Sequence, residues 1–182
     1  ENYGIETDIR DYHGNLVISH DIPKETCVSF EDFLKLYNNQ TSKATLAINI
    51  KSDGLQDIIN TLLKKHNIEN YFVFDMSIPD HYLYAKKGII SFTRHSEIEL
   101  HPNLYKESSG VWMDQFISDW ITSDSITKHM DAGKKVCIVS PELHGRDKTI
   151  AWSNYKELPK AYLDKMQICT DFPSEADSFF ND

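Results

Sequence analysis

The sequence lacks the features of several common protein classes. Its 182 residues contain no run of eighteen apolar residues, which argues against a bilayer-spanning helix. They contain three cysteines and no CxxC pair, so neither a disulfide framework nor a structural zinc site is expected. The glycine-rich phosphate loops GxGxxG and GxxxxGK[ST] are missing as well, and so are internal repeats and low-complexity linkers.

Basic residues are also in short supply. Nineteen Lys and Arg residues stand against twenty-eight Asp and Glu residues, which gives a net charge of −9 and a pI near 5.3. Such a surface repels phosphate backbones and anionic membranes, so nucleic acid is not expected as a main partner. The first residue is Glu1, no secretory segment follows it, and the scattered cysteines indicate reduced thiols. We therefore expect a cytoplasmic protein.

Short apolar strands alternate with stretches of helical periodicity. The pattern predicts strands at residues 4–10, 16–20, 45–51, 71–75, 88–92, 110–114, 135–140 and 167–170. It predicts helices at 29–37, from a cap at Ser52-Asp53 through 63, at 80–86, at 124–131 and from 174. Apolar strands separated by helices are typical of an α/β fold with parallel strands.

Two architectures fit this order, an open doubly wound sheet and a TIM (β/α)8 barrel. Polar residues recur at the carboxyl ends of the strands, which favours the barrel, because barrel enzymes build their sites there. Seven barrel-type strands can be counted, one fewer than a closed barrel has, and the chain is shorter than the about 250 residues that such a barrel normally takes. We expect a single barrel domain over residues 1–182 whose first strand–helix unit would precede Glu1. A second copy could cover the edge left open, by pairing or swapping.

The first predicted strand carries candidate metal ligands. Glu6 and Asp8 are two residues apart, so both carboxylates point to one face, as suits Mg²⁺ or Ca²⁺. Arg10 shares that face and is a candidate substrate contact. The alternative is that the three residues are solvated charges. His20 and Asp21 follow directly after the return strand.

These residues resemble the glycerophosphodiester phosphodiesterase family. Residues 4–8 (GIETD) and 15–21 (NLVISHD) are similar to its Glu-x-Asp strand and the His-Asp that follows a short turn. Residues 47–51 (AINIK) are similar to its Ile-Glu-Ile-Lys strand, and residues 170–173 (TDFP) to its closing Thr-Asp-x-Pro. The resemblance extends over essentially the whole chain.

The resemblance implies a TIM barrel related to phosphatidylinositol-specific phospholipase C. It implies hydrolysis of a glycerophosphodiester to an alcohol and a phosphomonoester, and hence a role in lipid metabolism. Glu6 and Asp8 would hold the divalent metal, Mg or Ca. His20 would be one of two acid/base histidines, and Lys51 would hold the phosphate as a point charge.

Two departures from the family pattern leave a second hypothesis about the function open. The family's first histidine has no counterpart, because its strand would precede residue 1. Asn49 stands where the family has a third metal-binding Glu, and an amide oxygen brings no charge. The alternative is therefore a catalytically degenerate barrel that binds a phosphorylated ligand or a partner protein. A third hypothesis is a lyase-like member of the family that forms a cyclic phosphate.

Two further segments carry candidate substrate contacts. After the predicted strand at 135–140 come Glu142, His144 and Arg146, where Arg146 would grip a phosphate or sugar oxygen with help from His144. Trp112 and Asp114 share one strand face, so Trp112 could stack on a sugar and Asp114 could bind hydroxyls or metal. The alternatives are a solvated loop with an internal ion pair and core packing of Trp112. Together the segments suggest a larger phosphorylated sugar or glycan precursor as the substrate.

Overall fold

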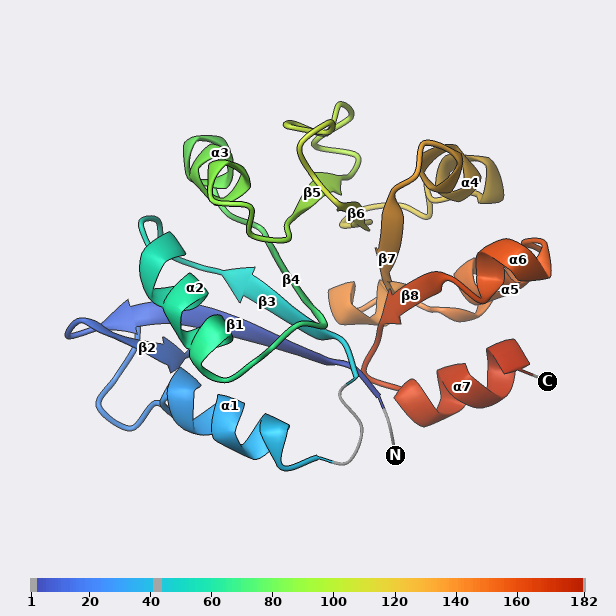
Figure 1. The fold of residues 1–182 in the computed structure, drawn as a ribbon. Helices are drawn as coiled ribbons and strands as arrows, with labels where there is room; N and C mark the ends of the chain where they lie inside the picture. Colours follow the sequence, from blue (N-terminus) through green and yellow to red (C-terminus); the bar gives the residue numbers. More distant parts are fainter. Residues whose placement is uncertain (1–2, 41–43, 182) are drawn as a thin grey trace. The chain divides into compact units, whose positions relative to one another are not determined.

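The computed structural model describes residues 3–40 and 44–181. The chain divides into two compact units, unit 1 (Glu1–Phe92) and unit 2 (Thr93–Asp182), drawn in blue to green and in yellow-green to red in Figure 1. Each unit is built on a four-stranded sheet in which most strands are parallel, with helices packed against it. The predicted α/β class is confirmed. The barrel architecture remains a prediction.

Unit 1 alternates strands and helices. Its elements are β1 (Ile5–Tyr12), β2 (Asn15–Ile18), α1 (Phe30–Asn38), β3 (Leu46–Ile50), α2 (Gln56–Lys65), β4 (Tyr71–Phe74) and α3 (Ile78–Lys86). The strand order is β2-β1-β3-β4, with β1, β3 and β4 parallel and β2 antiparallel to β1. His13 and Gly14 make the hairpin turn at φ of 48° and 80°, the left-handed conformation that a tight hairpin requires.

The strands of unit 1 have two chemically different faces. Ile9, Ile48 and Val73 pack with Leu34 of α1 and Ile59 of α2 in one apolar core. Because side chains alternate along a strand, the residues between them lie on the opposite face. That face carries the polar residues of β1 and β3.

In unit 1, the structure confirms the predicted start of one helix and contradicts the predicted start of another. The helix predicted at 29–37 is α1, which Ser29 caps: its hydroxyl accepts a hydrogen bond from the backbone N–H of Asp32. The cap predicted at Ser52-Asp53 is wrong, because α2 begins at Gln56. The Asp53 carboxylate instead accepts from the Ser77 hydroxyl, with both O···O distances at 3.0 Å.

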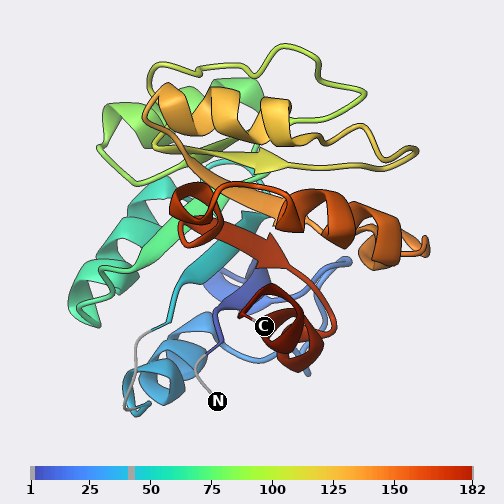
Figure 2. The ribbon, with the colours of Figure 1, turned by 90° about the vertical axis from the view of Figure 1, so that its right-hand side faces the viewer.

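Unit 2 repeats the alternation with extra short helices. Its elements are β5 (Phe92–His95), β6 (Gly110–Met113), α4 (Ser123–Asp131), β7 (Lys135–Val139), the 3₁₀ helix η1 (Pro141–His144), α5 (Thr149–Lys156), α6 (Lys160–Leu163), β8 (Met166–Cys169) and α7 (Pro173–Asn181). The order is β5-β6-β7-β8, and Figure 2 shows the parallel β6, β7 and β8 side by side, from yellow to red. Val111, Ile138, Ile126, Trp152 and Tyr155 belong to its core.

Two expectations about these elements need correction. The strand predicted at 88–92 lies later, at β5, and Ser91 makes only an isolated bridge with Val73. The helices α5 and α6 were not predicted, because Thr149–Lys156 is only weakly periodic and Lys160–Leu163 is a single short turn. In the described part of the chain, no helix is long and apolar enough to cross a membrane. Among the described residues, Cys27, Cys137 and Cys169 take part in no disulfide bond.

Candidate functional site

The polar face of unit 1 gathers the residues of the Glu-x-Asp strand. Parallel pairing of β1 with β3 places Asp8 beside Asn49 and Glu6 beside Ala47. Glu6 and Asp8 lie on the same face of β1, while Thr7 and Ile9 between and after them are buried on the other. The predicted metal ligands therefore share one face near the carboxyl ends of two adjacent strands.

Asp8 is the centre of a charged network. Its Oδ2 lies 3.2 Å from His20 Nδ1, and its Oδ1 lies 3.5 Å from Lys51 Nζ. An ionised carboxylate only accepts hydrogen bonds, so this contact assigns the proton of His20 to Nδ1 and leaves Nε2 for a ligand. Arg10 Nε donates to the backbone carbonyl of His20 at 3.1 Å. Arg10, predicted as a substrate contact, thus also positions the segment that carries the imidazole.

Glu6 has an unusual protonation equilibrium. Desolvation by the surrounding protein, and then the negative charge of Asp8, raise the pKa of Glu6 from 4.5 to about 7. A hydrogen bond from the Asn49 side chain and the charges of Lys51 and His20 act in the opposite direction. Water still reaches the Glu6 side chain. This is a carboxyl group that a nearby cation would readily deprotonate.

The donor atoms on this face fit a hard divalent cation. Glu6 and Asp8 offer carboxylate oxygens, and the buried Asn49 Oδ1 has no hydrogen-bond partner among the described residues. A buried amide oxygen without a partner is costly unless something binds it. The same described residues hold no cluster of three or more His, Cys, Asp or Glu suited to a metal. The candidate set is therefore two carboxylates and one amide oxygen.

Sequence reasoning did not select one member of this network, Asp75. Lys51 Nζ lies 3.3 Å from Asp75 Oδ2, so the ammonium group bridges Asp8 and Asp75. Asp75 follows β4 with a positive φ of 70°, which interrupts the strand alternation. The signal was present as an acidic residue at the end of an apolar strand, but the direction of its side chain depends on that backbone turn.

In unit 2 the structure joins two predicted residues that are thirty positions apart. His144 Nε2 lies 2.7 Å from Asp114 Oδ1, and the backbone N–H of Gln115 donates to the same oxygen at 2.9 Å. Asp114 is buried, and the ring of Phe116 packs at 4.9 Å from the ring of His144. This is a carboxylate–imidazole pair inside a packed loop cluster.

The other residues predicted in unit 2 are tied to backbone and neighbouring loops. Arg146 bonds to the Asp119 carboxylate and the Gln115 carbonyl, so its ion pair joins two loops and is not internal to its own. Glu142 accepts hydrogen bonds from the hydroxyls of Ser140 and Thr170.

Trp112, the predicted stacking residue, is 6% exposed on β6. A side chain so deeply buried offers little ring surface to a sugar, so its position favours a role in core packing. Its role as a substrate contact remains a prediction.

The fold is shared with several solved structures. A protein from Galdieria sulphuraria, assigned as a glycerophosphodiester phosphodiesterase, matches 99% of this chain and 86% of its own, with a TM-score of 0.75 and 17% identity. The glycerophosphodiester phosphodiesterase of Agrobacterium tumefaciens C58 matches 91% of this chain and 81% of its own, at a TM-score of 0.60 and 11% identity. A glycerophosphoryl diester phosphodiesterase from Parabacteroides distasonis matches 100% of this chain and 76% of its own, at a TM-score of 0.65 and 11% identity.

These likenesses concern the fold. No protein-family model matches the sequence, and no curated protein matches it. The resemblance noted from the motifs is thus confirmed in the fold, at identities too low to carry an activity from one protein to another.

Proposed function

We propose that the protein is a metal-dependent phosphodiester hydrolase of the glycerophosphodiester phosphodiesterase type. It would cleave a glycerophosphodiester or a related phosphorylated small molecule to an alcohol and a phosphomonoester. The observation that carries the proposal is the Asp8 carboxylate held between His20 Nδ1 and Lys51 Nζ, beside Glu6 and the unpartnered Asn49 Oδ1. The shared fold supports it.

Glu6, Asp8 and Asn49 would hold the cation, Mg²⁺ or Ca²⁺. When bound, such a cation polarises phosphoryl oxygens and offsets the charge that develops in the transition state. Asp8 would also orient the His20 ring through Nδ1, leaving Nε2 to carry a proton to the departing alkoxide or from the attacking water. Lys51 is held by two carboxylates with 18% of its side chain exposed, so its ammonium group is positioned to attract a phosphate oxygen.

Several finer points belong to the same proposal. We place the strands in a (β/α)8 barrel, in keeping with the motif order, and the protein in the cytoplasm, in keeping with described cysteines that form no disulfide. The expected substrate is small, and a larger phosphorylated sugar remains the hypothesis for the alcohol part.

The test is hydrolysis of bis(p-nitrophenyl) phosphate and glycerophosphocholine, with Mg²⁺ or Ca²⁺ titrated into chelator-treated protein. His20→Ala should abolish turnover and leave calorimetric metal binding intact. His13→Asn is the matched control, because His13 lies on the same hairpin at a positive φ that Asn tolerates. Unchanged turnover in His20→Ala would remove the acid/base role from the proposal.

A specific observation supports a second candidate, a barrel that binds phosphorylated ligands without turnover. Asn49 gives the site one formal charge fewer than a third carboxylate would. Metal binding by the wild-type protein without release of product from either substrate, together with binding of a phosphodiester, would favour this second candidate.

A further inference from the structure

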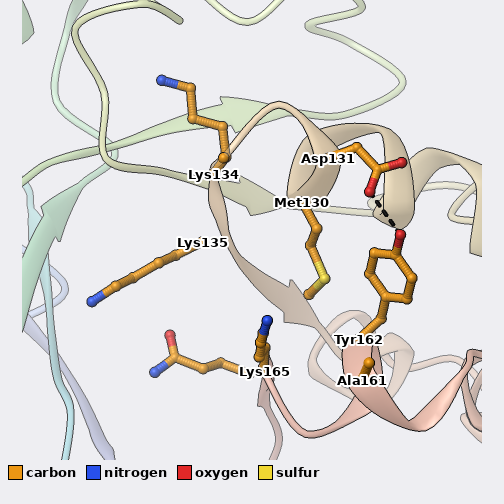
Figure 3. A pocket seen from close by; sticks show the side chains of 9 residues that line it. Met130, Asp131, Lys134, Lys135, Ala161, Tyr162 and Lys165 are labelled. Carbon is orange, nitrogen blue, oxygen red and sulfur yellow. Dashed lines mark hydrogen bonds between the residues drawn. The ribbon is translucent and has the colours of Figure 1, made fainter.

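Unit 2 has a pocket of about 660 Å³ at the edge of its sheet where β7 and β8 begin. The end of α4, the start of β7, helix α6 and the start of β8 surround it (Figure 3). The Asp114–His144 pair follows the carboxyl ends of β6 and β7, at the opposite edge of the same sheet. The pocket is therefore separate from the Asp114–His144 pair.

The charge lining this pocket is predominantly positive. Lys134, Lys135 and Lys165 line it together with a single carboxylate, that of Asp131. Asp131 accepts a hydrogen bond from the Tyr162 hydroxyl at 2.7 Å, drawn as the dashed line in Figure 3. In a chain with a net charge of −9, a cavity lined by three lysines and one acid is unusual.

Two of the three lysines make neither a hydrogen bond nor an ion pair with the described residues through their ammonium groups. Lys134 Nζ donates to the Ser108 carbonyl at 2.6 Å. Within residues 3–40 and 44–181, no ion pair or hydrogen bond engages the ammonium groups of Lys135 and Lys165. Both groups are thus available to a ligand.

The sheet register brings these two lysines together. Val136 of β7 pairs with Met166 of β8, so the backbones of Lys135 and Lys165, one residue earlier on each chain, are neighbours at the amino edge. Both side chains are exposed, and Figure 3 shows them extending in different directions. Like charges on neighbouring strands repel each other. An anion bound between them would replace that repulsion with two attractive contacts.

We propose that this pocket binds a small phosphate dianion, inorganic phosphate or a phosphomonoester, between the ammonium groups of Lys135 and Lys165. Lysines recognise phosphate as point charges, and two of them match a dianion in total charge. The pocket volume is large enough for a phosphate with a small organic group, and the net negative charge of the chain disfavours polyanions.

The experiment is an NMR amide-shift titration of the full chain with sodium phosphate, at constant ionic strength maintained with chloride. A chelator keeps divalent metal, and with it metal-bound phosphate, out of the measurement. We expect saturable 1:1 binding with the largest shifts at residues 134–136 and 165–167. Lys135→Gln and Lys165→Gln should each weaken binding by about tenfold, and the double variant should abolish it.

Lys160→Gln is the matched control. Lys160 lies on α6 beside the pocket, but its ammonium group pairs with Asp164 at 3.0 Å. Its removal should leave the affinity unchanged. An equal loss in Lys160→Gln would show diffuse charge attraction and would overturn the proposal, as would phosphate binding no tighter than chloride binding or full affinity in the double variant.

A second titration with glycerol 3-phosphate separates the two sources of the dianion. Tighter binding of the ester would assign the pocket to a phosphomonoester, whereas equal affinity would assign it to phosphate itself. The double variant should keep phosphodiester turnover, because neither lysine belongs to the Asp8 network. Failure of this proposal therefore leaves the proposed hydrolase function untouched, and the reverse also holds.

Discussion

Each unit holds one carboxylate–histidine pair near the carboxyl ends of parallel strands, and the two pairs differ in what surrounds them. In unit 1, His20 is 70% exposed and Asp8 20% exposed. In unit 2, His144 is 24% exposed and Asp114 only 9% exposed. The chemical groups are the same, but the imidazole of the first pair is far more exposed to solvent than that of the second.

The hydrogen-bond partners of the two pairs differ as well. Near Asp8, the Asn49 Oδ1 atom has no hydrogen-bond partner within the described residues, and the pKa of Glu6 is raised to about 7. Asp114 instead accepts from His144 and from a backbone N–H, and its own carbonyl accepts from Trp120 Nε1 at 2.7 Å. Buried atoms without a partner among the described residues lie near both pairs, since Gln115 Oε1 beside Asp114 is one as well, so exposure is the difference that remains. The comparison teaches that an exposed pair can reach a ligand, whereas a buried pair that bonds across loops helps to hold them in place.

The largest effect should follow from neutralising the pair in unit 1. Asp8→Asn removes a charge that would hold the cation and orients His20 less strongly, so metal-dependent hydrolysis should fall by about 10³-fold or more. Initial rates with bis(p-nitrophenyl) phosphate measure this loss, and circular dichroism checks the fold. Asp11→Asn, on the same strand but exposed, should keep wild-type rates. Equal rates in Asp8→Asn and wild type would end the functional distinction between the two pairs.

The corresponding change in unit 2 should act on stability. Asp114→Ala leaves His144 and the Gln115 N–H without their acceptor, which should cost about 1–3 kcal/mol in the free energy of unfolding. Urea denaturation measures this cost, with the exposed Glu107→Ala as the control. Metal affinity should not change. A stable Asp114→Ala protein with impaired turnover would instead place this pair in catalysis.

A smaller effect should come from restoring charge at Asn49. Asn49→Glu should tighten Mg²⁺ or Ca²⁺ binding by about tenfold, because a carboxylate replaces a neutral amide oxygen. Asn49→Asp makes the same change in charge with a shorter side chain, which covers the case that Glu is too large for this buried position. Calorimetric titration of both variants provides the measurement. Unchanged affinity in both would place Asn49 outside the cation site.

The smallest effect concerns the pH dependence of stability in metal-free protein. Glu6 keeps its proton up to about pH 7 in the folded state, whereas its ordinary pKa is 4.5. Between these values the folded state binds more protons than the unfolded state, so the free energy of unfolding should fall as pH rises through this window. Glu6→Gln should remove this contribution from urea unfolding measured across the window, and the exposed Glu25→Gln should keep it. A slope that persists in Glu6→Gln would assign it to another group.

Local patterns predicted much of unit 1. Alternation along β1 correctly placed Glu6 and Asp8 on one face, and the Ser29 signal correctly predicted the start of α1. Both depend on residues only two or three positions apart, where backbone geometry leaves little freedom. The order of the strands and helices followed from the same local periodicity.

Other features depended on contacts that no local pattern contains. The start of β5 is set by pairing with β6, since the apolar residues before Phe92 would suit a strand equally well. Helix α5 is held by burial of Trp152 and Tyr155 in the core of unit 2 rather than by strong periodicity.

The sequence by itself determined the α/β class, the polar face of the first strand and the candidate residues Glu6, Asp8, His20 and Lys51. Only the tertiary structure decided that Lys51 joins Asp8 to Asp75, and that Asp114 and His144 meet across thirty residues inside a packed cluster. The physical reason is that strand alternation and helix capping are local, whereas burial and hydrogen bonds between distant residues arise when distant segments pack together. Burial distinguishes the exposed Asp8–His20 pair from the buried Asp114–His144 pair.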